Sequence, residues 1–165
     1  MFLVWQKRNI HGLVFQRGAT CRFQQIYCLE GYDYLHHRFM DHPMTWYEAK
    51  LFCNGLGAKL LEIDSSAENK AILGEIKKRG FHRQKKHFWL GLTDRRQEGE
   101  WVLESTLKQP RFTNWARGQP DGSGWFRLKD EDCAYIKANT KWNDWNCWEK
   151  RFLSWTRNAL CEKSS

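Results

Sequence analysis

Six cysteines in a chain of 165 residues are the feature that most constrains its fold. An even count in a chain of this size is typical of a protein that folds in an oxidising compartment, so we expect an extracellular or secreted location. The even count also argues against a free thiol nucleophile. No stretch approaches the ~18 apolar residues of a membrane-spanning helix. The composition fits a secreted hydrolase about as well as a secreted binding module.

The N-terminus does not match the secretory signal that this location predicts. Residues 1–5 are apolar, but Lys7 and Arg8 end the run well short of the 7–15 apolar residues that a signal peptide needs. We interpret residues 1–20 as a tail or an incomplete targeting segment, and residues 21–165 as a single domain.

The net charge of +8 is concentrated in residues 77–87, which hold six basic residues and no acidic ones. Such a segment can bind a heparin-like anionic polysaccharide or another polyanion. The alternative is a solvated helix end and loop. We expect no nucleic-acid partner and no membrane insertion.

Two helices are expected ahead of most of the strands. Residues 45–48 have the spacing of a capping box, and apolar residues follow at three- and four-residue steps as far as Leu56. Ser65 begins a second helix, which Gly80 ends; its inward candidates are Ala67, Ile72 and Ile76. Short strands are expected at residues 60–63, 88–92 and 133–136 and near 159–161, and residues 93–129 read as long loops. This order indicates an α+β fold.

Oxygen-bearing side chains gather in the loop-rich half, in residues 119–121, 130–132 and 142–144 and around Asp94 and Glu98. Carboxylates and amides that converge from loops suit calcium, which takes six to eight oxygen ligands. Zinc would require histidines and cysteines, and the six histidines show no metal-ligand spacing. For any single one of these groups, solvated loop acids are the simpler interpretation.

Taken together and in order, these segments resemble the C-type lectin domain over roughly residues 32–163. The matching motifs are Trp46-Tyr47-Glu48-Ala49, Gly57-Ala58-Lys59-Leu60-Leu61, Glu68-Asn69, Trp89-Leu90-Gly91-Leu92, Asn114-Trp115, Gln119-Pro120-Asp121, Glu131-Asp132-Cys133, Trp142-Asn143-Asp144 and Leu160-Cys161-Glu162.

The resemblance implies a fold of two helices flanking small antiparallel sheets, with a long calcium- and sugar-binding loop region. It also implies two disulfides, Cys53–Cys161 and Cys133–Cys147. Cys21 and Cys28 would form the extra N-terminal bridge of longer members, although their spacing from Trp46 is unusual. Intermolecular pairing of these two cysteines is the alternative.

The resemblance also implies calcium as the cofactor. The primary calcium ligands would be Gln119, Asp121, Glu131, Asn143 and Asp144, with a cis peptide bond before Pro120. An auxiliary calcium site would use Asp94, Glu98, Glu131 and Asp132. Two neighbouring sugar hydroxyls would coordinate the primary calcium and hydrogen-bond to Gln119, Asp121, Glu131 and Asn143.

The tripeptide Gln119-Pro120-Asp121 resembles the galactose-preferring branch, so we expect ligands with terminal galactose-type sugars. Trp125 is the candidate for stacking on the apolar face of the sugar, with Phe126 second, and packing of Trp125 beneath the loop is the alternative. Trp145 and Trp148 are expected in the aromatic core, and a place on the surface near the site is the alternative. Single sugar sites are weak, so a homo-oligomer is expected to add avidity.

An enzyme is the less favoured class. Glu131 and Asp132 could imitate a glycosidase pair, but the resemblance assigns both to calcium. The stronger alternative is a lectin-like domain that binds a protein or an anionic polysaccharide through residues 77–87.

Overall fold

The structure is a computed structural model that describes residues 8–10, 13–15, 37–84, 86–122, 130–137, 141–149, 151–152 and 155–163. The predictions for Cys21, Cys28, Trp125 and Phe126 lie outside these residues. Within the described part of the chain, no helix is both long enough and apolar enough to cross a membrane.

Helix α1 (Trp46–Gly55) begins at the predicted capping box. The Glu48 backbone N–H donates to the Thr45 hydroxyl at 3.1 Å, and the Thr45 backbone N–H donates to the Glu48 carboxylate at 2.8 Å. Trp46, Ala49 and Cys53 form its buried face. The predicted start and inward face of this helix are therefore confirmed.

Helix α2 (Ser66–Lys78) is capped by Ser65, whose hydroxyl accepts from the Glu68 backbone N–H at 3.1 Å. Ile72 and Ile76 are buried as predicted, whereas Ala67 is exposed. Asn69 takes a buried position instead, because its Oδ1 accepts a hydrogen bond from the Trp142 indole at 3.0 Å. Hydrophobicity alone could not reveal that contact.

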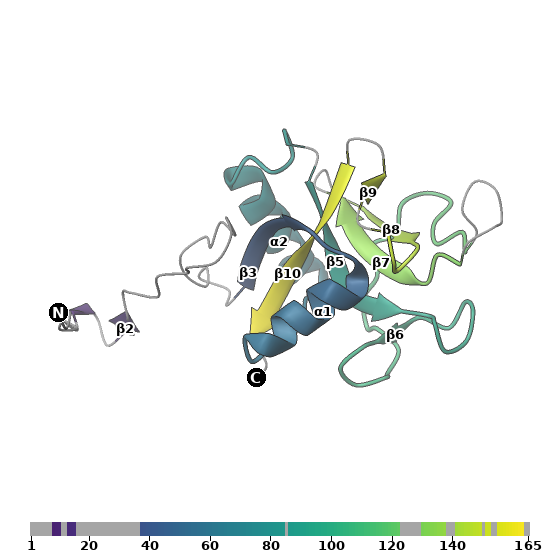
Figure 1. Ribbon diagram of the computed structural model, residues 1–165, viewed down its shortest axis with the longest axis horizontal. Helices are drawn as coiled ribbons and strands as arrows, with labels where there is room; N and C mark the ends of the chain where they lie inside the picture. The colour runs from purple at the N-terminus through teal and green to yellow at the C-terminus, as the bar shows by residue number, and fades with distance from the viewer. Residues whose placement is uncertain are drawn as a thin grey trace.

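The main sheet has the strand order β3-β10-β5-β7-β8 (Figure 1). Strand β5 lies at its centre, antiparallel to β7 and parallel to β10, so the sheet is mixed rather than purely antiparallel. Three short strands pair with β10 or β5 outside this order, and β1 and β2 pair separately with each other. The strands are β1 (Arg8–Ile10), β2 (Leu13–Phe15), β3 (His37–Pro43), β4 (Ala58–Leu60), β5 (Lys86–Thr93), β6 (Val102–Leu103), β7 (Cys133–Lys137), β8 (Trp142–Trp145), β9 (Arg151–Phe152) and β10 (Trp155–Lys163).

The strand predicted at residues 60–63 ends earlier, at Leu60. Beyond it, the Leu61 backbone bridges two strands rather than following one. Its N–H donates to the Leu160 carbonyl at 2.9 Å, and its carbonyl accepts from the Gly91 N–H at 2.7 Å. The chain is therefore buried and hydrogen-bonded at Leu61, but it does not extend the pairing of β4 with β10.

The core divides between two hydrophobic clusters that β5 joins. Phe88, Leu90 and Leu92 belong to the cluster that contains Ile72 and Ile76 of α2. Trp89 belongs to the second, which contains the buried face of α1. This alternation follows from the two-residue period of a strand. Because both neighbouring faces are covered, β5 reads in sequence as a continuous apolar run.

Both disulfides implied by the resemblance are confirmed. Cys53 on α1 bonds to Cys161 on β10, with 5.4 Å between the Cα atoms. Cys133, the first residue of β7, bonds to Cys147, which follows β8, at a Cα separation of 5.3 Å. The second bridge lies beside the loops that carry most of the candidate metal ligands.

Candidate metal and sugar site

Three carboxylates from separate segments meet at one end of β7 and β8. Asp121, Glu131 and Asp144 each offer an oxygen, and these oxygens lie within 4.8 Å of one another. Glu131 shortly precedes β7, and Asp144 lies within β8. Asp121 follows the Gln119–Pro120 peptide bond, which is cis as predicted. We call these three residues the primary acidic group.

Hydrogen bonds hold the loop of Asp121 against β8. The backbone N–H groups of Asp121 and Gly122 both donate to Oδ2 of Asp144 at 2.8 Å. In return, the Asp144 backbone N–H donates to Oε1 of Gln119 at 3.2 Å. The side chains of Gln119 and Asp144 therefore take part in positioning the loop that carries Asp121.

Two buried oxygens on β8 have no hydrogen-bond partner among the described residues: Oδ1 of Asn143 and Oδ1 of Asp144. Burial of a polar oxygen without a partner is costly. A hard cation that accepts carboxylate and amide oxygens would satisfy both atoms. The residues present therefore fit a bound calcium ion.

The electrostatics of the primary acidic group also favour a bound cation. Burial, together with the charges of Asp144 and Asp121, raises the pKa of Glu131 from 4.5 to about 8. Burial also raises the pKa of Asp144. Without a cation, these acids cannot all be ionised at neutral pH, because their charges repel in a poorly solvated space.

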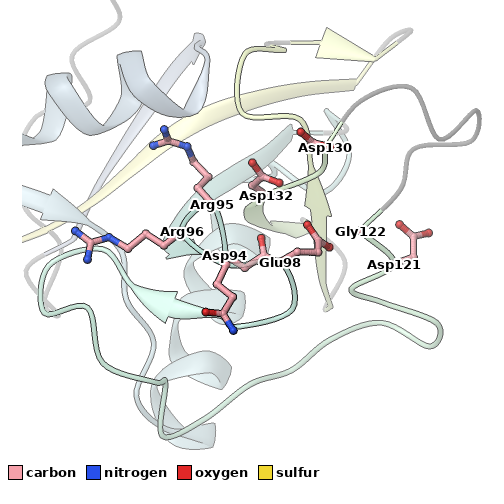
Figure 2. A pocket seen from close by; sticks show the side chains of 9 residues that line it. Asp94, Arg95, Arg96, Glu98, Asp121, Gly122, Asp130 and Asp132 are labelled. Carbon is pink, nitrogen blue, oxygen red and sulfur yellow. The ribbon is translucent and has the colours of Figure 1, made fainter.

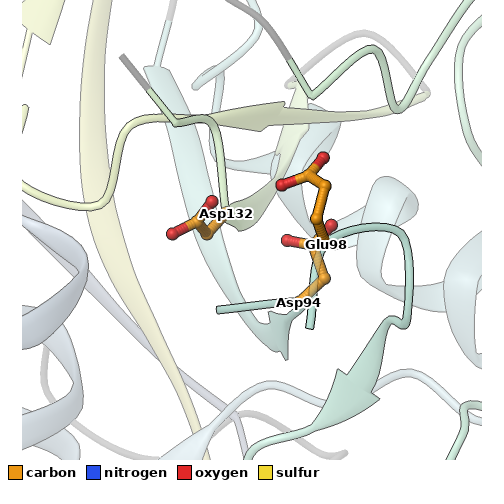
Figure 3. A group of neighbouring side chains, drawn as sticks. All are labelled: Asp94, Glu98 and Asp132. Atoms are coloured by element: carbon orange, nitrogen blue, oxygen red, sulfur yellow. The ribbon is translucent and has the colours of Figure 1, made fainter. Parts of the chain in front are cut away.

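A second trio, Asp94, Glu98 and Asp132, lies together at the end of β5 (Figure 3). Oδ2 of Asp94 accepts from the Gly99 N–H at 2.9 Å, while its buried Oδ1 has no hydrogen-bond partner in the described chain. Burial raises the pKa of Asp94 from 3.8 to about 6, and the charges of Glu98 and Asp132 act in the same direction. Glu131, expected in both sites, lies in the primary acidic group.

A pocket of about 670 Å³ joins the two acidic groups (Figure 2). Its lining includes the second trio together with Asp121 and Gly122 of the primary loop. Gly122 has a φ of 62° and lies so close to Glu98 that a Cβ atom there would overlap the carboxylate. Sequence reasoning did not select three further lining residues: Arg95, Arg96 and Gln97.

Arg157 is another residue that sequence reasoning missed. It is only 2% exposed, and its guanidinium lies 4.6 Å from the Tyr135 ring centroid and 4.5 Å from that of Trp145. Its positive charge counteracts part of the rise in the pKa of Glu131. No local pattern marks Arg157, because its partners come from other strands.

The two tryptophans around Cys147 differ in exposure. Trp145 is partly buried and packs against the cluster that contains Trp46. Trp148 is 67% exposed, so its expected place in the aromatic core is wrong. Its backbone N–H donates to Oδ1 of Asn146 at 2.9 Å, in a turn that follows β8.

Comparison with known proteins agrees with this fold. A family described as "Lectin C-type domain" matches residues 42–163. Hepatic lectin of Gallus gallus is 34% identical over 136 residues, which are 82% of this chain and 58% of that protein. Asialoglycoprotein receptor 2 of Rattus norvegicus is 35% identical over 126 residues, covering 71% of this chain and 39% of the receptor.

The chain thus spans little more than half of one curated relative and less of the other. Among solved structures, the human scavenger receptor C-type lectin carbohydrate-recognition domain has a TM-score of 0.66 and 29% identity, covering 78% of this chain and 90% of that one. Such domains bind carbohydrates, generally with calcium, and are not enzymes, so the expectation of a binding module is confirmed. The chain belongs to the C-type lectin domain family.

Proposed function

We propose that this domain binds glycans with terminal galactose or N-acetylgalactosamine in a calcium-dependent manner. The observation that carries the proposal is the primary acidic group, whose three carboxylates lie within 4.8 Å of one another beside the unpartnered Oδ1 atoms of Asn143 and Asp144. Gln119, Asp121, Glu131, Asn143 and Asp144 would hold the ion. The bound calcium would supply a Lewis-acidic centre for two sugar hydroxyls.

The protein side chains give the site its selectivity. A carboxylate of Asp121 or Glu131 accepts from a sugar hydroxyl, while an amide of Gln119 or Asn143 donates to it. The sequence Gln119-Pro120-Asp121 fixes which side offers the amide and which the carboxylate, and this arrangement supports galactose-type ligands. The names of the hepatic lectin and the asialoglycoprotein receptor also support a glycan ligand.

Three further assignments complete this proposal. Asp94, Glu98 and Asp132, together with Glu131, which directly precedes Asp132, would hold an auxiliary calcium. Trp125 would stack on the apolar face of the sugar. Two disulfides and a calcium site of the extracellular kind support function outside the cell, where assembly into a homo-oligomer would add avidity.

A glycan array probed in calcium and then in EGTA tests the proposal. We expect galactose-type glycans to bind in calcium only. Asp121→Ala and Asn143→Ala should abolish this binding, whereas the matched control Asp64→Ala, at an exposed acid outside the site, should leave it unchanged. Binding that persists in EGTA, or in both site variants, would show that the site is wrongly assigned.

An anionic polysaccharide such as heparin is the second candidate ligand, because the basic segment lies far from the acidic groups. Strand β5 begins at Lys86 and ends at Thr93, so it places Lys86 roughly 25 Å from Asp94. Lys77 and Arg83 are exposed and form no ion pair with any described residue. These two residues are therefore available to bind sulfate groups.

Heparin-affinity chromatography in EGTA tests this second candidate. The double variant Lys77→Gln/Arg83→Gln should elute at lower salt than the parent, and the control Lys70→Gln, an exposed lysine on the same helix, should not. Equal elution of all three proteins would exclude the segment as the binding surface. It would leave protein binding as the remaining alternative for these residues.

A further inference from the structure

Trp148 is an exposed aromatic residue whose ring packs on the ring of Tyr47. The residue is 67% exposed, whereas most large hydrophobic residues in the described part of the domain are buried or partly buried. One side of the indole packs on Tyr47, with 4.1 Å between the ring centroids and a tilt of 33°. Tyr47 in turn carries the Arg95 guanidinium 4.7 Å from its ring centroid. We call Trp148, Tyr47 and Arg95 the Trp148 platform.

The first turn of α1 and the turn after β8 together hold the platform in place. Tyr47 lies in the first turn of α1, which the capping box fixes. The Trp148 backbone N–H donates to Oδ1 of Asn146, and Nδ2 of Asn146 donates to the Asp130 carbonyl at 3.2 Å. The exposed ring is therefore positioned before any ligand arrives, so little side-chain entropy is lost on binding.

The same contacts connect the platform to the pocket between the acidic groups. Arg95 and Asp130 both line that pocket, together with Asp121 of the primary loop. Figure 2 shows Arg95 and Arg96 on the side of the pocket away from Asp121. The electrostatic influence of both Arg95 and Asp132 on Tyr47 also indicates that the platform lies near the second acidic trio.

We propose that the Trp148 platform is a second sugar subsite, which takes a further ring of the glycan whose terminal residue is bound at the primary acidic group. The inference rests on the proposed function. The C–H face of a pyranose would stack on the open indole of Trp148, and Arg95 would donate to the hydroxyls at its edge. Arg95 of the platform and Asp121 of the primary acidic group line the same pocket, so a glycan can extend from one toward the other.

Calorimetric titration of the full chain in calcium tests this subsite with galactose and with galactose-terminated di-, tri- and tetrasaccharides. Trp148→Ala should leave the affinity for galactose unchanged. It should weaken the binding of at least one longer glycan by about 2- to 10-fold, the range expected for one aromatic stacking contact. Trp148→Phe should retain part of that affinity. Leu51→Ala, at a side chain on α1 that is 69% exposed, is the matched control and should bind every ligand as the parent does.

The outcomes separate the subsite from the proposed function. If Trp148→Ala binds all the glycans as the parent does, the subsite is excluded, while binding that Asp121→Ala abolishes leaves the primary site intact. If no galactose-terminated ligand binds the parent, the proposed function fails and the subsite fails with it. If sedimentation shows that Trp148→Ala converts a dimer to a monomer, the ring belongs to an interface between copies, which also overturns the subsite.

Discussion

At the scale of single residues, the chemistry of the site was more predictable than its surroundings. Oxygen-bearing residues in the loops, read with the family resemblance, pointed to the carboxylates of both acidic groups. Arg157 and the exposure of Trp148 had no comparable signal. Arg157 is defined by aromatic rings on other strands, and the exposure of Trp148 depends on a turn and on Tyr47. Both are consequences of non-local packing.

The raised pKa of Glu131 predicts that calcium affinity depends on pH near neutrality. The folded, calcium-free protein keeps Glu131 protonated up to about pH 8, whereas an unfolded chain ionises it near 4.5. Calcium needs the carboxylate, so its binding releases this proton. We expect calcium affinity to fall by roughly tenfold per pH unit from about pH 8 to pH 6, measured by titration calorimetry. Equal affinity at both pH values would contradict this.

The same shift has a consequence for stability. Because the folded-state pKa of Glu131 lies above its unfolded value, the stabilisation it contributes is complete below about pH 4.5 and is lost as the pH rises through 8. The contribution of Glu131 in EGTA should therefore decline from about pH 6 to pH 8.5, while calcium binding strengthens. Calcium should raise the Tm more at the higher pH, and scanning calorimetry at both values would measure the difference.

At the scale of elements, local signals located the helices better than the strands. The caps at Thr45 and Ser65 are hydrogen bonds between residues three apart, so the sequence displays both partners. Strands depend on partners elsewhere in the chain. Strand β4 therefore lies at Ala58–Leu60 rather than at the predicted residues 60–63, and the two-residue strands β6 and β9 had no usable pattern.

Gly91 lies in the central strand β5, where residues 60–62 pass too close to leave room for a side chain. Its N–H donates to the Leu61 carbonyl, and a Cβ atom at this position would lie 2.9 Å from the Leu60 carbonyl oxygen and 2.8 Å from Cγ of Glu62. Glu62 cannot easily move, because its carboxylate accepts from the backbone and hydroxyl of Ser105 at 2.8 and 2.6 Å.

Gly91→Ala should therefore lower the free energy of unfolding by ~1–3 kcal/mol, as expected for overpacking of a filled interior. Gly74→Ala is the matched control: Gly74 lies within α2, and no atom lies within 4 Å of an added Cβ. This variant should gain up to ~1 kcal/mol from helix propensity. Urea unfolding in calcium with both disulfides intact would measure the two changes, and a neutral Gly91→Ala would show that Glu62 does move aside.

At the scale of the whole molecule, β5 separates two regions of opposite charge. The sequence showed a basic segment and an acidic loop region, but it could not show how far apart they lie. Lys86 is the first residue of β5, and Asp94 directly follows its last residue, Thr93. The net charge of +8 therefore conceals a domain with a basic end and an acidic end.

This separation predicts that heparin and a galactose-type glycan bind the same molecule at once. Sites farther apart than about 10 Å that share no contacts behave nearly independently, so saturation with a heparin fragment should change the Kd for the glycan by less than about twofold. Raising the salt concentration should release heparin, whose attraction is screened, and leave the calcium-held glycan bound.

Surface plasmon resonance on immobilised heparin, with the glycan injected second, would show both events. The variants should separate the two activities: Asp121→Ala should lose only the glycan, and Lys77→Gln/Arg83→Gln should weaken only the binding of heparin. Displacement of heparin by the glycan would mean that the two ligands share one surface, and the two-ended arrangement would then be wrong.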